Sequence, residues 1–271
     1  MDECRKRMFK RSFGRKATAL VFAVVAAVAG SAADGGELRL MSYNLHHCAG
    51  MDRRVDCART AAAVLKERPD FAGLQELDVN AHRSGRVDQP TELARLTGMH
   101  ATFAKAIDLP TGGEYGVAVL SREKPLSVVR EPLPGPEPRV LLLCEFTNCW
   151  FGTTHLDSGT VPGDPAPAHI MSVPIVSNAV ARCAAAKPVF LTGDWNAVPQ
   201  SPLAERMRGF LTTLNDTNRP TNGNLRRCID YVTVDSANAG GFRIVERHVT
   251  LDKMTSDHKP VVVTLSTVPQ G

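Results

Sequence analysis

The stretch "TSDHKPVVVTL", residues 255–265, places a hydroxyl, a carboxylate and an imidazole side by side, shortly before a run of valines. The valine run predicts a buried strand, because β-branched side chains favour strands. Ser256, Asp257 and His258 therefore lie at the mouth of that strand, either in a polar surface turn or in a functional site. The remainder of the sequence discriminates between these two interpretations.

An apolar run that ends in polar residues occurs five more times in the sequence. Taken singly, a polar residue at a strand end is more often a turn cap or a solvated side chain than a ligand. Taken together, several converging carboxylates would repel one another unless a cation lay among them. These polar residues are Asn44 in "MSYN", Glu76 in "LQE", His155 and Asp157 in "TTHLD", Asp194 and Asn196 in "LTGDWN", and Asp230 in "RCIDY".

The types of donor indicate which cation and which reaction such a site would serve. Oxygen donors without clustered cysteines or histidines favour Mg²⁺, Mn²⁺ or Ca²⁺. A cation of this kind commonly binds one or two carboxylates together with the phosphate of a substrate. The set therefore predicts hydrolysis of a phosphoester, with a metal-polarised phosphoryl group and an activated water.

Helical patterns lie between the apolar runs. Apolar residues at three- and four-residue spacing predict a helix over residues 55–67, which Pro69 ends. Further helices are predicted at "PTELARLTG", residues 90–98, and before Ala186. The segment "REPLPGPEPR", residues 130–139, holds four prolines and is predicted to be a loop. Strands that alternate with helices predict one α/β domain over residues 36–268.

Residues 1–33 have the features of a signal peptide. A basic segment precedes the apolar stretch "ATALVFAVVAAVAG", residues 17–30, which is shorter than the about 20 residues of a membrane span. The small residues Ser31, Ala32 and Ala33 follow and are typical of a cleavage site. An uncleaved membrane anchor is the alternative. The net charge of +4 divides into +5 on residues 1–33 and −1 on the remainder, so it does not indicate nucleic-acid binding. We expect a secreted or periplasmic monomer without a transmembrane span in the mature chain.

Six of the seven cysteines lie outside the predicted signal peptide. An even number of cysteines in an exported chain suggests disulfides. Local spacing favours the pairs Cys48–Cys57 and Cys144–Cys149 as hypotheses, and buried free thiols are the alternative. The absence of a C-x-x-C pair argues against a zinc site.

The ordered motifs resemble those of the endonuclease/exonuclease/phosphatase superfamily, which has the deoxyribonuclease-I-like fold. The resemblance spans nearly the whole mature chain, and the order of the motifs makes it specific. It implies an α/β fold: a four-layer α-β-β-α sandwich of two packed, mainly antiparallel sheets flanked by helices. The motifs are "YNLHH", "LQELD", "YGVAVLSR", "TTHLD", "GDWNAVP", "CIDYV" and "TSDHKPV".

The resemblance also implies roles for the residues at matching positions. Asn44, Glu76 and Asp257 match the groups at the metal, Mg²⁺ or Mn²⁺ with Ca²⁺ as a further possibility. The other matches are His155, which contacts or protonates the scissile phosphate; Asp194 and Asn196, which orient the attacking water and the phosphate; Asp230, which holds and polarises the final histidine; and His258, which is that histidine.

Three further residues are predicted to contact substrate. His47 matches a histidine near the phosphate in a subgroup of exported bacterial metal-dependent hydrolases, and its alternative is a loop residue without a role. Arg226 lies close to Asp230 in the sequence, where it binds a further phosphate or forms a solvated basic pair with Arg227. Asp157 follows His155 in "TTHLD" and is the third predicted substrate contact.

The leading hypothesis is a divalent-metal-dependent phosphodiesterase or phosphatase that acts outside the cytoplasm. A small or lipid-linked phosphoester is favoured over nucleic acid, because duplex binding depends largely on neutralising phosphates with basic residues. A secreted DNA or RNA endonuclease is the first alternative. A non-catalytic binding protein on the same fold is the second, and the intact set of acids, amide and histidines argues against it.

Overall fold

Two six-stranded β-sheets form the centre of the protein, over the described residues 36–158, 167–224 and 226–268 of this computed structural model. The first sheet has the order β11 (Phe242–Val249), β12 (Val261–Thr267), β1 (Glu37–Asn44), β2 (Phe71–Val79), β4 (Glu114–Ser121) and β3 (His100–Asp108). The second has the order β5 (Ser127–Leu133), β6 (Arg139–Glu145), β7 (Trp150–His155), β8 (Val189–Asp194), β10 (Asp230–Asp235) and β9 (Leu211–Thr213). One pair in each sheet is parallel, β1–β2 and β7–β8, and the other pairs are antiparallel.

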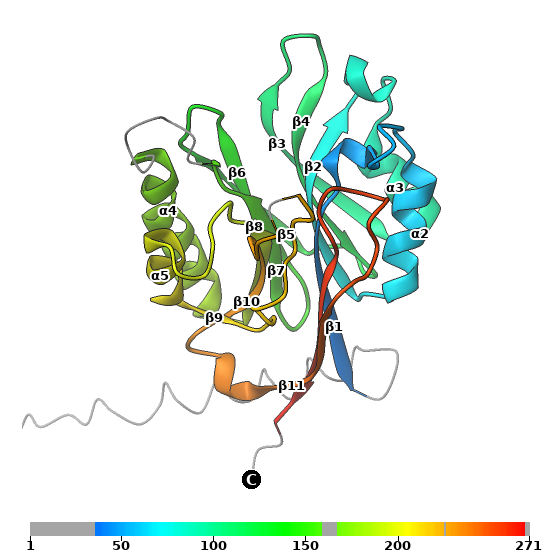
Figure 1. The fold of residues 1–271 in the computed structure, drawn as a ribbon. Helices are drawn as coiled ribbons and strands as arrows, with labels where there is room; N and C mark the ends of the chain where they lie inside the picture. The colour runs from blue at the N-terminus through cyan, green and yellow to red at the C-terminus, as the bar shows by residue number, and fades with distance from the viewer. Residues whose placement is uncertain (1–35, 159–166, 225, 269–271) are drawn as a thin grey trace, which may run out of the picture.

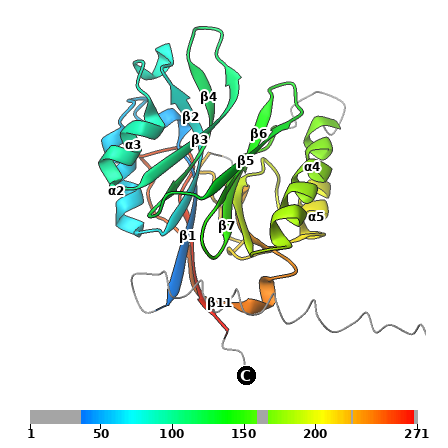
Figure 2. The ribbon, with the colours of Figure 1, turned by 180° about the vertical axis from the view of Figure 1, so that it is seen from behind.

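The helices lie on the outer faces of the two sheets (Figures 1 and 2). The first sheet is covered by α2 (Cys57–Glu67) and α3 (Gln89–Thr97), and the second by α4 (Pro167–Ala184) and α5 (Pro202–Arg208). Among the described residues, the short 3-10 helices η2 (His46–Cys48) and η3 (His82–Ser84) each connect a strand to the following helix, and η4 (Ala239–Gly241) connects β10 to β11. The predicted fold class, a four-layer sandwich of mainly antiparallel sheets, is confirmed. Within the described ranges, no helix has both the length and the apolar character needed to cross a membrane.

Capping side chains set the boundaries of α2 and α3. Asp56 accepts a hydrogen bond from the Arg59 backbone N–H, so the helix predicted over residues 55–67 begins at Cys57. Asp88 accepts from the Thr91 backbone N–H in the same way at the start of α3. Gly98, at φ 71°, ends α3 in the left-handed conformation that glycine adopts without strain.

The two sheets approach each other closely at Gly73 of β2. A Cβ atom added there would lie 2.8 Å from the Thr153 Cβ of β7, so the spacing between the sheets depends on glycine. Beside it, Gln75 Nε2 donates to Thr153 Oγ1 over 2.7 Å, a buried hydrogen bond between the sheets. These contacts fix β2 against β7, and with them the polar residues Glu76 and His155 that follow.

The loop predicted over residues 130–139 is shorter in the structure, because β5 continues to Leu133 and β6 begins at Arg139. Pro132 pairs with Val140 on β6, and β5 is at the edge of its sheet. An edge strand tolerates proline, since one side of its backbone needs no partner. The apolar runs also do not predict β3, β9, β11 or α5. Most residues of β11 are exposed, so its sequence lacks the apolar run by which the other strands are predicted.

The predicted disulfides Cys48–Cys57 and Cys144–Cys149 are corrected by the structure, in which all four of these cysteines are free thiols. On the β6–β7 hairpin Cys144 pairs with Phe151, so Cys149 lies two residues from the opposite position. Such diagonal neighbours are about 7 Å apart, whereas a disulfide needs Cβ atoms about 4 Å apart. A hydrogen bond between the Cys48 and Cys57 thiols raises the pKa of Cys48 and lowers that of Cys57.

The predicted signal peptide, residues 1–33, lies outside the described residues. The elements above fall within the predicted domain, residues 36–268.

Candidate active site

Strand pairing in the second sheet places three predicted site residues side by side. His155 at the end of β7 pairs with Asp194 at the end of β8, and Asp194 pairs with Asp230 at the start of β10. Side chains of directly paired residues point to the same face of a sheet. The register therefore gathers an imidazole and two carboxylates at one edge, and all three are buried.

His258 lies between the two carboxylates. Its Nδ1 is 2.9 Å from Asp230 Oδ2, and its Nε2 is 3.6 Å from Asp194 Oδ2. An ionised carboxylate only accepts, so His258 Nδ1 carries a proton and donates it to Asp230. Burial lowers the pKa of His258, but the charges of Asp230 and then Asp194 outweigh it and raise the pKa to about 10. The side-chain amide of Asn222 is 2.8 Å from Nε2.

Asn44 links the two sheets at this edge. From the end of β1, its Nδ2 donates to Glu76 Oε1 over 2.8 Å and to Asp194 Oδ2 over 3.0 Å. Glu76 has φ 61°, an uncommon backbone conformation for a residue with a side chain, at an irregularity in the β2–β4 pairing. Asn44 therefore holds two carboxylates from different sheets within reach of one another.

His155 has hydrogen-bonding groups at both ring nitrogens. Arg139 Nη1 lies 3.1 Å from Nδ1, and a guanidinium only donates, so Nδ1 accepts and Nε2 carries the proton. On the other side of the ring, Nε2 lies 3.6 Å from Asp194 Oδ2, an acceptor, and 3.0 Å from Asn196 Nδ2, which donates to the Leu156 carbonyl over 2.9 Å. The Asn196 backbone N–H donates to Asp194 Oδ1 over 2.8 Å. Burial, then the charges of Arg139 and His258, lower the pKa of His155 well below its usual value. His155 is therefore a neutral hydrogen-bond donor near pH 7.

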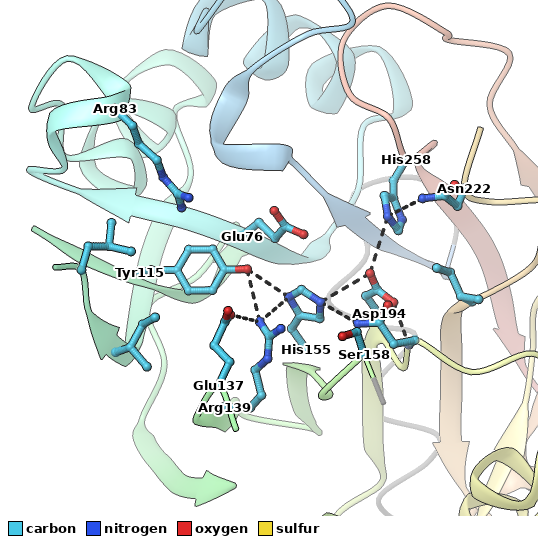
Figure 3. Close-up of a pocket in the computed structure, with 14 residues that line it drawn as sticks. Glu76, Arg83, Tyr115, Glu137, Arg139, His155, Ser158, Asp194, Asn222 and His258 are labelled. Carbon is cyan, nitrogen blue, oxygen red and sulfur yellow. Dashed lines mark hydrogen bonds and ion pairs between the residues drawn. The ribbon is translucent and has the colours of Figure 1, made fainter. Parts of the chain in front are cut away.

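A cavity of about 350 Å³ lies beside this group of residues (Figure 3). Asn44 and Asp230 do not line it. Each contacts a residue that does: Asn44 contacts Glu76, and Asp230 contacts His258. The predicted site residues in the lining are Glu76, His155, Asp194, Asn196 and His258. Polar lining residues that were not predicted are Arg83, Tyr115, Glu137, Arg139, Ser158 and Asn222.

Four predicted site residues lie away from this cavity. Asp257 and Arg226 line a second cavity of about 380 Å³, which shares Asn222 with the first. His47 has a buried Nδ1 without a hydrogen-bond partner among the described residues, and burial is the main cause that lowers its pKa to about 4. Asp157 is buried and lines neither cavity. The roles predicted for these four residues stay predictions.

The donor set around Asp194 fits a hard divalent cation. Asp194, Asp230 and His258 offer ligand atoms within 4.8 Å of one another. Burial and then the charge of Asp230 raise the pKa of Asp194 to about 7, which indicates a local excess of negative charge. Since His258 Nδ1 is engaged by Asp230, the carboxylates of Asp194 and Glu76 are better candidate ligands than the imidazole. Asn44 contacts both carboxylates, whereas Asp257 lies in the neighbouring cavity.

The residues that sequence reasoning missed lie at the beginnings of motifs or between them. Tyr115 lies in the strand "YGVAVLS", and Arg139 is the last residue of the proline-rich segment. Their position beside a strand end was a usable signal, but their convergence on His155 depends on strand pairing between distant segments. Arg83 lies in the short helix η3 and Asn222 outside the named helices and strands, and no sequence pattern distinguishes either residue.

Comparisons with known proteins agree with this geometry. Residues 41–258 match the Endonuclease/Exonuclease/phosphatase family. None of the curated protein sequences matches the chain. Among solved structures, an endonuclease/exonuclease/phosphatase from Beutenbergia cavernae DSM 12333 is similar with a TM-score of 0.70 and 26% sequence identity, over 85% of this chain and 72% of that chain.

Two more distant structures share the fold alone. The human Nocturnin catalytic domain with bound sulfate anion has a TM-score of 0.62 and 17% identity, over 86% of this chain and 94% of that chain. A mannosyl-6-phosphatase from Bacteroides thetaiotaomicron has a TM-score of 0.60 and 18% identity, over 86% of this chain and 100% of that chain.

Proposed function

Because this chain belongs to the Endonuclease/Exonuclease/phosphatase family, we propose that it is a divalent-metal-dependent phosphoesterase. It hydrolyses a P–O bond of a phosphodiester or phosphomonoester by in-line attack of water. The observation that carries the proposal is the sequence of contacts Asp230–His258–Asp194 beside a cavity. Asn196 and His155 border the same cavity.

Each residue of this group has a distinct role in the proposed reaction. Asp194 orients the attacking water and accepts its proton, as a carboxylate at hydrogen-bond distance can. Asp230 accepts a hydrogen bond from His258 Nδ1 and so fixes the orientation of the ring. This orientation leaves Nε2 on the side where the phosphoryl group would bind. Asn196 donates to a phosphoryl oxygen without adding charge. Neutral His155 donates a hydrogen bond from Nε2, which stabilises the charge that builds on the phosphoryl oxygens.

A bound divalent cation, Mg²⁺ or Mn²⁺ with Ca²⁺ as a further candidate, supplies neutralisation of charge on the phosphoryl group. Glu76 and Asp194 would hold it, and Asn44 and Asp257 are the two further ligands that the sequence predicts, Asn44 beside both carboxylates and Asp257 in the neighbouring cavity. The hydrogen bond from Asn44 Nδ2 fixes one oxygen of Glu76 at 2.8 Å and orients its carboxylate. Hydrogen bonds to a metal-ligating side chain fix the orientation of its donor atoms.

The proposed substrate is a small or lipid-linked phosphoester rather than nucleic acid. The cavity of about 350 Å³ suits a compact group. The chain outside residues 1–33 carries a net charge of −1, which is unfavourable for a general duplex binder. We further propose that residues 1–33 direct export, and that the protein is a secreted or periplasmic monomer. Its N-terminal sequence after export would test this, with cleavage after Ala33 as the expected result.

The test of function compares bis-p-nitrophenyl phosphate, p-nitrophenyl phosphate and supercoiled plasmid as substrates of the purified protein. Each is assayed with Mg²⁺, Mn²⁺, Ca²⁺ or a chelator. Metal-dependent cleavage of a small ester that exceeds plasmid nicking is the expected result. Preferred nicking of plasmid would instead favour a nuclease. Inactivity of the folded protein on all three substrates would contradict the general phosphoesterase proposed here.

A further inference from the structure

We propose that the cavity contains a second anion-binding subsite, formed by Arg83, Tyr115 and Arg139. It binds an acidic group of the substrate other than the scissile phosphoryl group. This inference rests on the proposed function, since it names the substrate class of the same cavity: a compact phosphoester that carries a further phosphate or carboxylate. The three residues lie together at the end of the cavity away from His258 (Figure 3).

Arg139 supplies a buried guanidinium with unused hydrogen-bonding capacity. Its residue surface is 8% exposed, yet it lines the cavity. Nη1 contacts His155 Nδ1 at 3.1 Å, the Tyr115 hydroxyl at 3.2 Å and Glu137 Oε1 at 3.0 Å. The buried Nε has no hydrogen-bond partner within the described part of the chain. Buried donors are nearly always paired, so this group indicates a place for a ligand oxygen.

Arg83 adds a second guanidinium that is held in a fixed orientation. Its Nε and Nη2 donate to the two carboxylate oxygens of Asp78 over 2.8 Å and 2.7 Å, and the Asp78 side chain is fully buried. A bidentate pair of this kind fixes the guanidinium plane. The Arg83 side chain nevertheless remains 42% exposed and lines the cavity. Asp78 therefore positions Arg83 without removing it from the reach of a ligand.

Tyr115 lies between the two arginines. The guanidinium carbon of Arg83 is 5.4 Å from the centre of the Tyr115 ring, and that of Arg139 is 5.9 Å away. Both cations therefore contact one rigid aromatic ring, which sets their separation. The hydroxyl of this tyrosine is oriented by Arg139 and faces the same end of the cavity.

Glu137 occupies the position on Arg139 that a ligand anion would take. Its carboxylate comes from the segment between β5 and β6, and its side chain is 50% exposed. Pairs that involve an exposed carboxylate are weak and reversible in water. A substrate anion can therefore replace Glu137, and Glu137 competes with that anion for Arg139.

The geometry also limits the length of the substrate. Arg139 contacts Nδ1 of His155, while Nε2 of the same ring lies 3.6 Å from Asp194. The subsite and the proposed site of phosphoryl transfer are thus on opposite sides of one imidazole ring. A compact ligand whose two acidic groups lie close together would therefore contact both.

The experiment compares two non-hydrolysable ligands by calorimetric titration of the full chain with Mg²⁺. Methylphosphonate carries one acidic group, and phosphonoacetate carries a phosphonate and a carboxylate. We expect phosphonoacetate to bind about tenfold more tightly, as one added charge-assisted hydrogen-bonded pair would give. Arg83→Gln should remove this preference, whereas Glu137→Gln should increase it. Arg95→Gln, an exposed arginine outside the cavity, is the matched control and should leave it unchanged.

Arg83→Gln leaves the buried Asp78 carboxylate without its partner and can impair folding. The double variant Asp78→Asn, Arg83→Gln replaces both charges and should show the same loss of preference. Equal affinities of the wild-type protein for both ligands, an unchanged preference in the folded double variant, or no binding of either ligand would overturn the subsite. Intact discrimination by a protein that hydrolyses no phosphoester would overturn the proposed function alone.

Discussion

His258 Nδ1 lies 2.9 Å from Asp230 Oδ2, although 28 residues separate them in the sequence. Asp230 begins β10 in the second sheet, and His258 lies three residues before the start of β12 in the first. The pair therefore connects the two sheets at the edge where Asp194 and Asn44 also meet. Contact between the sheets and orientation of the imidazole depend on the same hydrogen bond.

We expect His258→Ala to lower kcat/KM for bis-p-nitrophenyl phosphate by about 10³-fold, the usual magnitude for loss of a group that exchanges a proton in the reaction. Asp230→Asn should lower it by a smaller factor, because the imidazole remains but its orienting charge is lost. Circular dichroism would establish that both variants are folded. His100→Ala, an exposed histidine outside the cavity, is the control. Near-normal turnover by folded His258→Ala would contradict the assigned role.

Gly73→Val should destabilise the protein by about 2 kcal/mol, because extra atoms in a packed interior force neighbouring groups to move. The neighbours here are Thr153 and Thr192 of the opposite sheet. Urea denaturation would measure the free energy of unfolding. Gly240→Val is the control, since a Cβ atom at Gly240 would meet no atom within 4 Å. Equal stability of the two variants would show that the sheets do not depend on glycine for their spacing.

The free energy of unfolding should decrease as the pH falls below about 6.5, because of His47. Burial, then the charges of Arg83 and His46, lower its pKa to about 4 in the folded state. The unfolded chain therefore takes up a proton that the folded chain does not, and stability is lost as the pH falls from 6.5 towards 4.

The measurement for His47 is the difference in Tm between pH 7 and pH 5. His47→Gln should reduce this difference, because glutamine does not titrate. His100→Gln changes an exposed histidine and should leave it as in the wild type. The same Tm difference in wild type and His47→Gln would contradict a depressed pKa for His47.

Protein that lacks residues 1–33 should contain six thiols when it is unfolded without reductant. The six described cysteines are all free, and five of them are buried. They should react with a thiol reagent slowly in the folded protein and completely in urea. A count of four or two would establish disulfides. The interacting pair Cys48 and Cys57 would then be the first to examine by mass spectrometry.

The motif residues and their strands could be predicted because each motif couples an apolar run to a polar end. This pattern predicts both a strand and the position of Asp194, Asp230 or His258 at its end. It does not predict β11, whose residues are mainly exposed and whose role is to pair with the edge of β12. Nor does it predict that Asp257 and His258, adjacent in sequence, line different cavities.

Arg139 shows why the remainder of the site could not be predicted. Its sequence neighbours are prolines and a glutamate, which indicate a solvated loop. It is buried against His155 at the end of β7 and against Tyr115, which comes from the other sheet. Contacts of this kind are set by the packing of two sheets, and no local pattern records them.

The pairing of β1 with β12 has a consequence for how the protein is made. β12 is inserted between β1 and β11, so the first sheet is incomplete until the residues up to Thr267 have left the ribosome. A nascent chain that already contains Asn44, Glu76 and Asp194 still lacks His258, which is synthesised three residues before β12 begins. Insertion of β12 therefore completes the sheet and delivers the histidine in one step. Hydrolytic activity should begin only when synthesis and folding of the domain are finished.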